Sequence, residues 1–280
     1  MQPQILVVTD PPHDKVDHDG VAALLELDVE DAKRKLGFPA PEVLLAADPR
    51  PAVDFAEALR DVGLRVAVID GRELAKVPWP APVSSFAFGG DSLVAQVGDS
   101  VVAYGYDERV LAVHCRPPSG FSPPASQAES AAAEEPRAGD DGLAIAESIQ
   151  WTASIDLYFT RGGSVERASI VEGRTDFSGL GNQGEASAAE DMAATLAECV
   201  RRFTDLELDT RLEGVRPRSR FVMGIKNFDY DLRKLYSYGT LLLRQVLDSI
   251  SPELRDLTHY DLGSRLAYVV SKQRGDGGAR

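Results

Sequence analysis

The stretch that most constrains the fold is residues 43–70, which read VLLAADPRPAVDFAEALRDVGLRVAVID. It opens with an apolar run of strand length, and the prolines that follow end this run because proline fixes φ and lacks an amide donor. Three apolar residues then recur at the i, i+4, i+7 spacing of one helix face: Phe55, Leu59 and Val62. Gly63 stands where a left-handed helix-ending residue is expected, and a second apolar strand follows. We expect the two strands to be parallel neighbours joined by a right-handed crossover.

The residues upstream of this unit supply a further strand and two helices. Ile5–Val8 has the length and composition of a strand, and Asp19–Leu27 has apolar residues at helical spacing. Asp28 is a good N-cap for a second short helix that ends at Leu36, before Gly37. The sequence therefore predicts a small module of order β-α-α-β-α-β within residues 1–75.

This module resembles a known family in three segments, DVEDAKRKL, PEVLLAAD and AEALRDVGLRVAVI. They are similar to the C-terminal domain of the bacterial ribosomal stalk protein, whose fold is shared with the adaptor of the Clp protease. The resemblance covers residues 19–70 and implies the same small α/β fold. In the stalk family a basic first helix recruits translation factors. Here the first helix has no Lys or Arg, and the nearest basic residues are Lys33, Arg34 and Lys35 on the second helix.

Charge and cysteine content restrict the partners and the compartment. The 280-residue chain has a formal net charge of −14, which argues against general binding to nucleic acids or to anionic membranes, since both require a positive field. It contains no run of about 18 apolar residues that could form a spanning helix. Its two cysteines, Cys115 and Cys199, lie in apolar surroundings and are expected as buried free thiols. We therefore predict a cytoplasmic protein.

Residues 84–210 have the pattern of short β-prone runs and turn residues that is typical of an antiparallel β-rich module. A proline-rich linker, 76–83, precedes four short β-prone runs with Gly-Asp turns, which we expect to form a four-strand meander. A hairpin over 154–172, closed by Arg161-Gly162-Gly163-Ser164, follows. Between them lies an acidic Pro/Ser/Ala/Glu-rich insert, 116–145, which carries too few apolar residues to order itself. An amphipathic helix over 187–203, with a Ser-x-x-Glu capping box, closes the module. Strands followed by one closing helix are weakly similar to a pleckstrin-homology-like barrel.

One enzymatic interpretation rests on the Gly-Asp-Ser-Leu sequence at residues 90–93. It is the signature of the GDSL-type serine hydrolases, which also use a Gly-Asn pair and a late Asp-x-x-His. The corresponding residues here are Ser92, Asn182, Asp256 and His259. The histidine of such a site accepts the serine proton. The same Gly-Asp-Ser phrase recurs at Gly98, however, and the surrounding texture predicts hairpin strands rather than the strand-to-helix turn that presents a nucleophile.

The C-terminal part, 211–280, combines a basic segment with helices. The basic residues are Arg211, Arg216, Arg218, Arg220 and Lys226. They could bind an acidic partner or dock on the acidic modules of the same chain. A long amphipathic helix over 229–250 is suited to a core or to a seam between two copies of the chain. A short helix over 261–271 and a polar tail over 272–280 follow.

Two further patterns have weaker chemical interpretations. The segment 10–19 clusters two His with four Asp, which could hold a divalent metal or could form a polar loop with Asp19 capping the next helix. Glycines at 179, 181 and 184 spell a dinucleotide fingerprint without the surrounding parallel βαβ unit. We therefore predict an α+β, multi-module, non-catalytic adaptor or regulatory protein that binds a protein partner or a second copy of itself, without a cofactor or metal; the alternative is a GDSL-like esterase.

Overall fold

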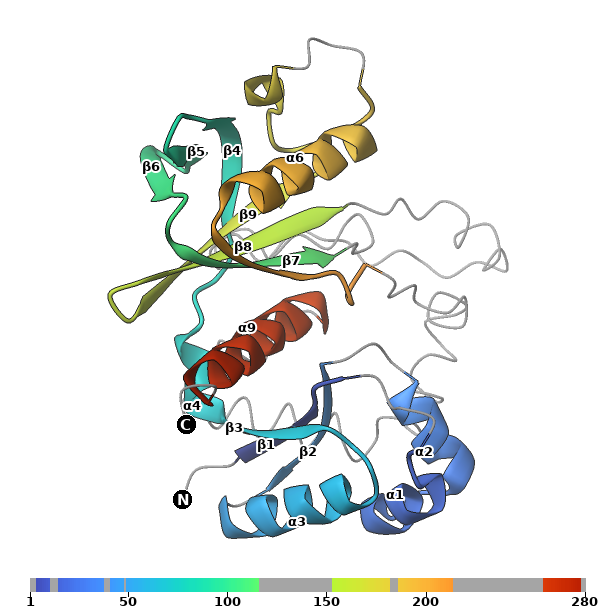
Figure 1. The fold of residues 1–280 in the computed structure, drawn as a ribbon. Helices are drawn as coiled ribbons and strands as arrows, with labels where there is room; N and C mark the ends of the chain where they lie inside the picture. Colours follow the sequence, from blue (N-terminus) through green and yellow to red (C-terminus); the bar gives the residue numbers. More distant parts are fainter. Residues whose placement is uncertain are drawn as a thin grey trace, which may run out of the picture. The chain divides into compact units, whose positions relative to one another are not determined.

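The computed structural model describes residues 4–10, 15–37, 41–47, 49–115, 153–181, 186–213 and 259–277. The fold is α+β, as predicted, and its chain divides into two compact units (Figure 1). Unit 1 contains the chain up to Lys76 together with the C-terminal helix, and unit 2 contains the described residues from Val77 to Glu213. The last helix therefore groups with the first module, whereas the sequence suggested a separate C-terminal part from 211 to 280.

Unit 1 has the predicted β-α-α-β-α-β order and two further helices. One helix follows the third strand, and the other comes near the C-terminus, after the residues of unit 2. Its elements are β1 (Gln4–Val8), α1 (His18–Leu25), α2 (Val29–Leu36), β2 (Glu42–Ala47), α3 (Pro49–Asp61), β3 (Val66–Asp70), α4 (Gly71–Lys76) and α9 (His259–Gly277).

The sheet of unit 1 corrects one prediction about its strands. Its order is β2-β1-β3, and β1 is antiparallel to both neighbours (Figure 1). The strands β2 and β3 are therefore parallel in direction but are separated by β1, and the prediction that they are neighbours is wrong. Ile5, Leu6 and Val7 are fully buried, and a continuous apolar run of this kind suits the central strand of a sheet.

Local capping explains the helix starts in unit 1. Asp28 caps α2 as predicted, since its Oδ1 accepts a hydrogen bond from the Asp31 amide at 2.7 Å. The cap of α1 is Asp17, whose Oδ1 accepts from the Gly20 amide at 3.0 Å. Asp19 lies in the first turn instead of capping the helix, where its charge still favours the helix dipole.

The helix α9 is longer than the 261–271 segment that the sequence predicts. Residues 272–277, expected as a polar tail, continue the helix. Three of their side chains form hydrogen bonds to earlier parts of unit 1: Lys272 Nζ to Glu73 Oε2 (3.4 Å), Gln273 Nε2 to the Val68 carbonyl (3.1 Å) and Arg274 Nη2 to Asp10 Oδ2 (2.7 Å). These contacts hold the polar side chains of residues 272–274 against the first module.

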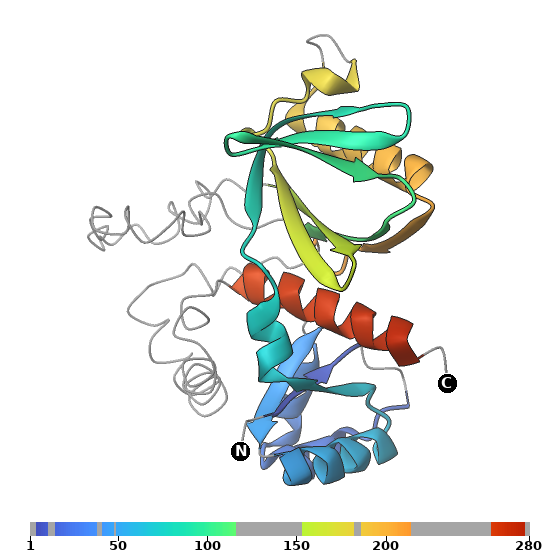
Figure 2. The same cartoon turned by 90° about the vertical axis from the view of Figure 1, so that its left-hand side faces the viewer.

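Unit 2 is a curled, mostly antiparallel sheet with one long helix. Its elements are β4 (Ala81–Phe88), β5 (Ser92–Val97), β6 (Ser100–Gly105), β7 (Arg109–Cys115), β8 (Ser154–Arg161), β9 (Ser164–Val171), η1 (Ser178–Leu180), α6 (Ala188–Arg202) and β10 (Asp205–Asp209). The strand order is β10-β7-β8-β9-β4-β5-β6, in which the pairs β7–β10 and β4–β9 are parallel (Figure 2). Residues 81–83 belong to β4, so the extended linker is shorter than the 76–83 segment predicted from its prolines.

The predicted turns of unit 2 are present, but the meander is interrupted. Gly98 begins the two-residue β5–β6 loop with a φ of 56°, and Gly162 and Gly163 both have positive φ in the β8–β9 loop. The strand β7 does not pair with β6; it pairs with β8 over seven residues and with β10 in parallel. The four-strand meander therefore holds only from β4 to β6.

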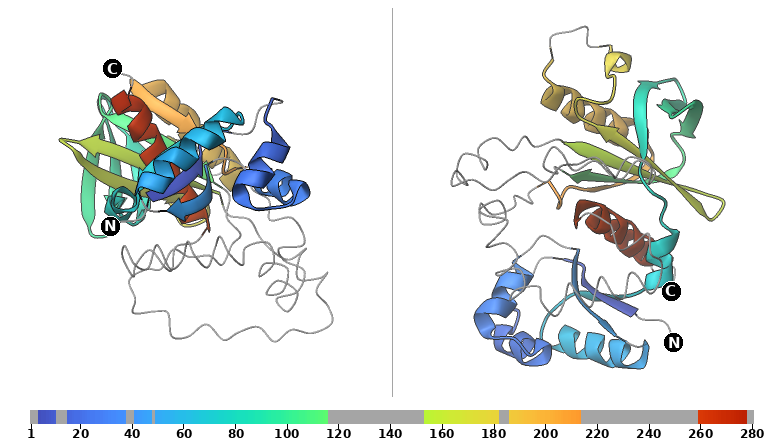
Figure 3. Two further views of the ribbon diagram at one scale, coloured as in Figure 1. Left: turned by 90° about the horizontal axis from the view of Figure 1, so that it is seen from below. Right: turned by 180° about the vertical axis from the view of Figure 1, so that it is seen from behind.

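The core of unit 2 lies between the curled sheet and α6, which is the predicted closing helix. Met192, Cys199 and the C-cap residue Phe203 pack into the cluster that the strands enclose. The Tyr104 and Phe159 rings stack at 3.7 Å between centroids. The predicted capping box is present, because Ser187 Oγ accepts from the Glu190 amide and Glu190 Oε2 accepts from the Ser187 amide. The helix η1 contacts β4 and α6 (Figure 3, right).

Candidate functional site: a groove between α6, η1 and β4

A groove of about 360 Å³ opens in unit 2 where the end of β4, the short helix η1 and the second half of α6 meet. Its lining is mixed, with apolar walls and one charged rim. The lining residues are Phe88, Gly179, Leu180, Ala194, Ala197, Glu198 and Arg202. A volume in this range suits one or two side chains of a peptide, or a small ligand.

Small residues create the space. A Cβ added at Gly179 would lie 1.9 Å from the Phe86 carbonyl oxygen, so only glycine lets η1 approach β4 this closely. On the opposite wall, Ala194 and Ala197 present single methyl groups. Ala194 and Ala197 therefore leave room on the α6 wall, while Gly179 sets how closely η1 lies against β4.

Aromatic packing orients the apolar wall. Phe86 is buried and meets Phe88 edge-to-face at 5.6 Å between ring centroids. Phe86 also meets Phe177, in the segment just before η1, at 5.7 Å and 90°. Phe88 therefore packs edge-to-face on Phe86, which in turn packs edge-to-face on Phe177.

Arg202 forms the charged rim and is held from three sides. Its Nε donates to Glu198 Oε2 at 2.6 Å, and its Nη1 donates to the Gly89 carbonyl oxygen at 2.8 Å. Its Cζ lies 5.4 Å from the centre of the Phe88 ring, a cation–π distance. No described residue accepts a hydrogen bond from its Nη2, which leaves that amino group available to a ligand.

The charged rim is a carboxylate paired with guanidinium groups. Hydrogen bonds from Arg201 and Arg202 lower the pKa of Glu198 to about 2, so this carboxylate is ionised at all physiological pH values. The hydrogen bond to Glu198 raises the pKa of Arg202 in turn. Two guanidinium groups thus face one carboxylate, but only Arg202 of the two lines the groove, so the charges of the lining itself, Glu198 and Arg202, balance.

The residues of the predicted esterase site are not brought together within either unit. Ser92 begins β5 of unit 2 with no helix after it, and its Oγ lies 3.4 Å from Asp91 Oδ1 on the surface. His259 is the first residue of α9 in unit 1. Asn182 and Asp256 lie outside the described residues. The position of Ser92 is that of a hairpin residue.

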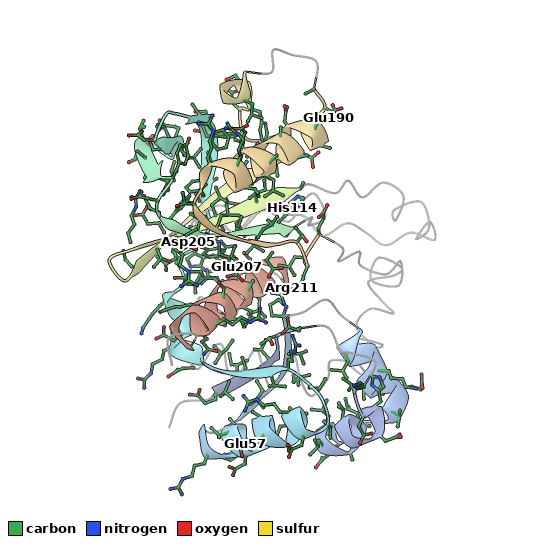
Figure 4. The ribbon with its side chains drawn as sticks, viewed as in Figure 1. Glu57, His114, Glu190, Asp205, Glu207 and Arg211 are labelled. Carbon is green, nitrogen blue, oxygen red and sulfur yellow. The ribbon has the colours of Figure 1, made fainter. Side chains whose placement is uncertain are left out.

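Of the five residues of the predicted basic partner site, only Arg211 lies within the described residues. Arg211 follows β10, and its Nε and backbone amide donate to Asp209 Oδ1 at 2.8 and 3.0 Å (Figure 4). This is a contact between neighbours in the turn after β10, and it tests neither of the two outcomes expected for the basic segment. Arg216, Arg218, Arg220 and Lys226 lie outside the described residues, as do the 116–145 insert and the 229–250 helix.

The other patterns have structural roles where they are described. Within the described ranges no group of three or more His, Cys, Asp or Glu side chains could hold a metal ion, and His13 lies outside them. Asp10 binds Arg274, and Gly179 of the glycine-rich segment packs on β4. Among the described helices, none combines the length and apolar character needed to cross a membrane.

Comparisons of the chain with protein-family models, with curated proteins and with solved structures found no match. The groove residues were missed in the sequence because nothing in their order links residue 88 to residue 179 or 202. One partial indication of the groove is present in the sequence: the small residues Ala194 and Ala197 lie near Glu198 and Arg202 along the second half of α6.

Proposed function

We propose that this chain is a non-catalytic binding protein of the adaptor type, which captures a peptide segment of a partner in the α6–η1–β4 groove. The observation that carries the proposal is the apolar wall of Phe88 and Leu180 beside the available Nη2 of Arg202. Binding sites commonly combine an apolar cleft with a few polar groups that fix orientation. The occupant that fits is an apolar side chain next to a carboxylate, either an acidic side chain or a chain end.

Two other features support an adaptor. The sequence of unit 1 resembles the ribosomal stalk domain and the Clp adaptor in three segments, and its β-α-α-β-α-β order is compatible with that resemblance. Cys115 and Cys199 are buried and form no disulfide, which fits a reducing compartment such as the cytoplasm.

The test is a selection of displayed peptides on the wild-type protein, followed by affinity measurements on groove variants. Ala197→Trp fills the groove, whereas Ala193→Trp places the same bulk on an exposed position of α6 that does not line it. We expect selected peptides to bind wild type and A193W equally and to lose at least about tenfold in affinity on A197W and on Arg202→Met, a change of about 1.4 kcal/mol. Equal binding by A197W would contradict the proposal.

The hydrolase alternative has its own measurement. Wild type and Ser92→Ala are compared for turnover of a p-nitrophenyl ester. A binding protein gives the same background rate for both, because Ser92 lies on a hairpin without a described histidine partner. Turnover that disappears in S92A would overturn the non-catalytic assignment.

A further inference from the structure

The strand β6 is an edge strand of the seven-stranded sheet, and the backbone groups that face away from β5 can be identified. It pairs with β5 on one side only, among the described strands. The Gly105 amide donates outward to Glu108 Oε1 at 2.7 Å, and the Ala103 carbonyl accepts from Arg161 Nη2. Because outward groups alternate in an antiparallel pair, Val101 also directs its amide and carbonyl away from β5.

Only half of this edge is covered. Arg161 and Glu108 bind each other at 2.7 Å (Nε to Oε2) and together occupy the edge at Ala103 and Gly105. Nothing in the described part of the chain bonds to the outward amide and carbonyl of Val101 or to the amide of Ala103. Proteins usually protect such edges with charge, proline or a bulge, and residues 100–105, SVVAYG, contain none of these. The Val101 side chain is 69% exposed, the highest value among the large exposed hydrophobic residues.

Acidic residues surround this open edge. Asp99 is exposed at the start of β6 and Asp107 is exposed just after its end. Four carboxylates and two guanidinium groups lie at or beside the two ends: Asp99, Asp107, Glu108, Glu166, Arg109 and Arg161. A second copy of the chain would bring the same excess of negative charge, so like-charge repulsion disfavours it as the occupant.

We propose that the open half of β6, residues 100–103, binds an extended segment of a partner protein that adds to the sheet as a further strand and carries Lys or Arg at both ends. Main-chain hydrogen bonds to the amide and carbonyl of Val101 and to the amide of Ala103 supply the affinity, and the flanking acids select the basic ends. This surface is separate from the α6–η1–β4 groove and does not depend on the function proposed for it.

The probe is a fluorescein-labelled peptide of sequence KVTVTVK, titrated against the full chain by fluorescence anisotropy at low salt. We expect saturable binding below about 1 mM, with slower hydrogen exchange of the Val101 and Ala103 amides. Val101→Pro removes the outward donor without touching the β5 ladder, and it should weaken binding at least about tenfold. Val101→Thr, which keeps the amide and the β-branched shape, should bind as wild type does.

A peptide N-methylated at alternate residues along one edge is the matched ligand control, because it keeps every side chain and cannot pair. Near-ultraviolet circular dichroism checks that V101P is folded. The proposal is overturned if KVTVTVK does not bind wild type, if V101P or the methylated peptide binds equally well, or if wild type self-associates through an interaction that V101P abolishes.

Discussion

Gly179 illustrates how one missing side chain shapes the molecule. The residue lies in η1 against the backbone of β4, and no rotamer of a neighbouring side chain can make room, since the atom in the way is the Phe86 carbonyl oxygen. The sequence pattern at 179–184 suggested a nucleotide fingerprint. The contact instead explains the glycine by close packing, which no spelling of the local sequence could have indicated.

Substitution of Gly179 by alanine should destabilise unit 2 by about 1–3 kcal/mol, because the new Cβ forces η1 off β4. Gly90→Ala is the matched control: a Cβ there meets nothing within 4 Å, and the change should stay within about 0.5 kcal/mol. Urea unfolding followed by thiol exposure reports on unit 2, which contains both cysteines. Equal stabilities of the two variants would contradict this account.

Glu198 gives a pH dependence of known sign. Its pKa in the folded state is about 2, below its ordinary value of 4.5, so on acidification the folded state binds this proton at a lower pH than the unfolded state does. The resulting stabilisation is present above about pH 4.5 and is lost as the pH falls towards 2. The stability advantage of wild type over Glu198→Gln should shrink across that range in urea titrations. An advantage that stays constant from pH 5 to about pH 2 would exclude Glu198 as its source.

At the scale of elements, the sequence predicted best what local interactions decide. The caps at Asp28 and Ser187, the glycine after α3 and the Gly-Gly hairpin depend on neighbours within a few residues, and each is found. The place of β1 between β2 and β3 and the departure of β7 from the meander depend on pairing over long sequence separations. The groove combines three such separated elements, so it could not be predicted from the order of residues.

The capping box of α6 is a local feature with a measurable effect. Ser187→Ala removes the acceptor for the Glu190 amide and should cost unit 2 about 1 kcal/mol. Ser187→Asn keeps a capping acceptor and should remain within about 0.5 kcal/mol of wild type. The measurement is the urea midpoint of thiol exposure; an equal loss in both variants would show that the serine acts through something other than its cap.

At the scale of the whole molecule, both thiols are enclosed in unit 2. Burial raises the pKa of Cys199 to about 12 from an ordinary value of 9.0. Since the unfolded state ionises first, stability falls as the pH rises from about 9 towards 12. At pH 8 we expect neither cysteine to react with Ellman's reagent in the folded protein and both to react in urea. Rapid reaction without denaturant would contradict the enclosed core.

Unit 1 is assembled from two distant stretches of chain, because α9 contacts α4 and β3 after the whole of unit 2 has intervened. During synthesis the strands β1 to β3 leave the ribosome long before their last helix does. The described elements of unit 2, which is contiguous in sequence apart from its insert, all lie before residue 210. A growing chain therefore has every described element of unit 2 before it has residues 259–277, and unit 1 gains its α9 contacts with α4 and β3 last.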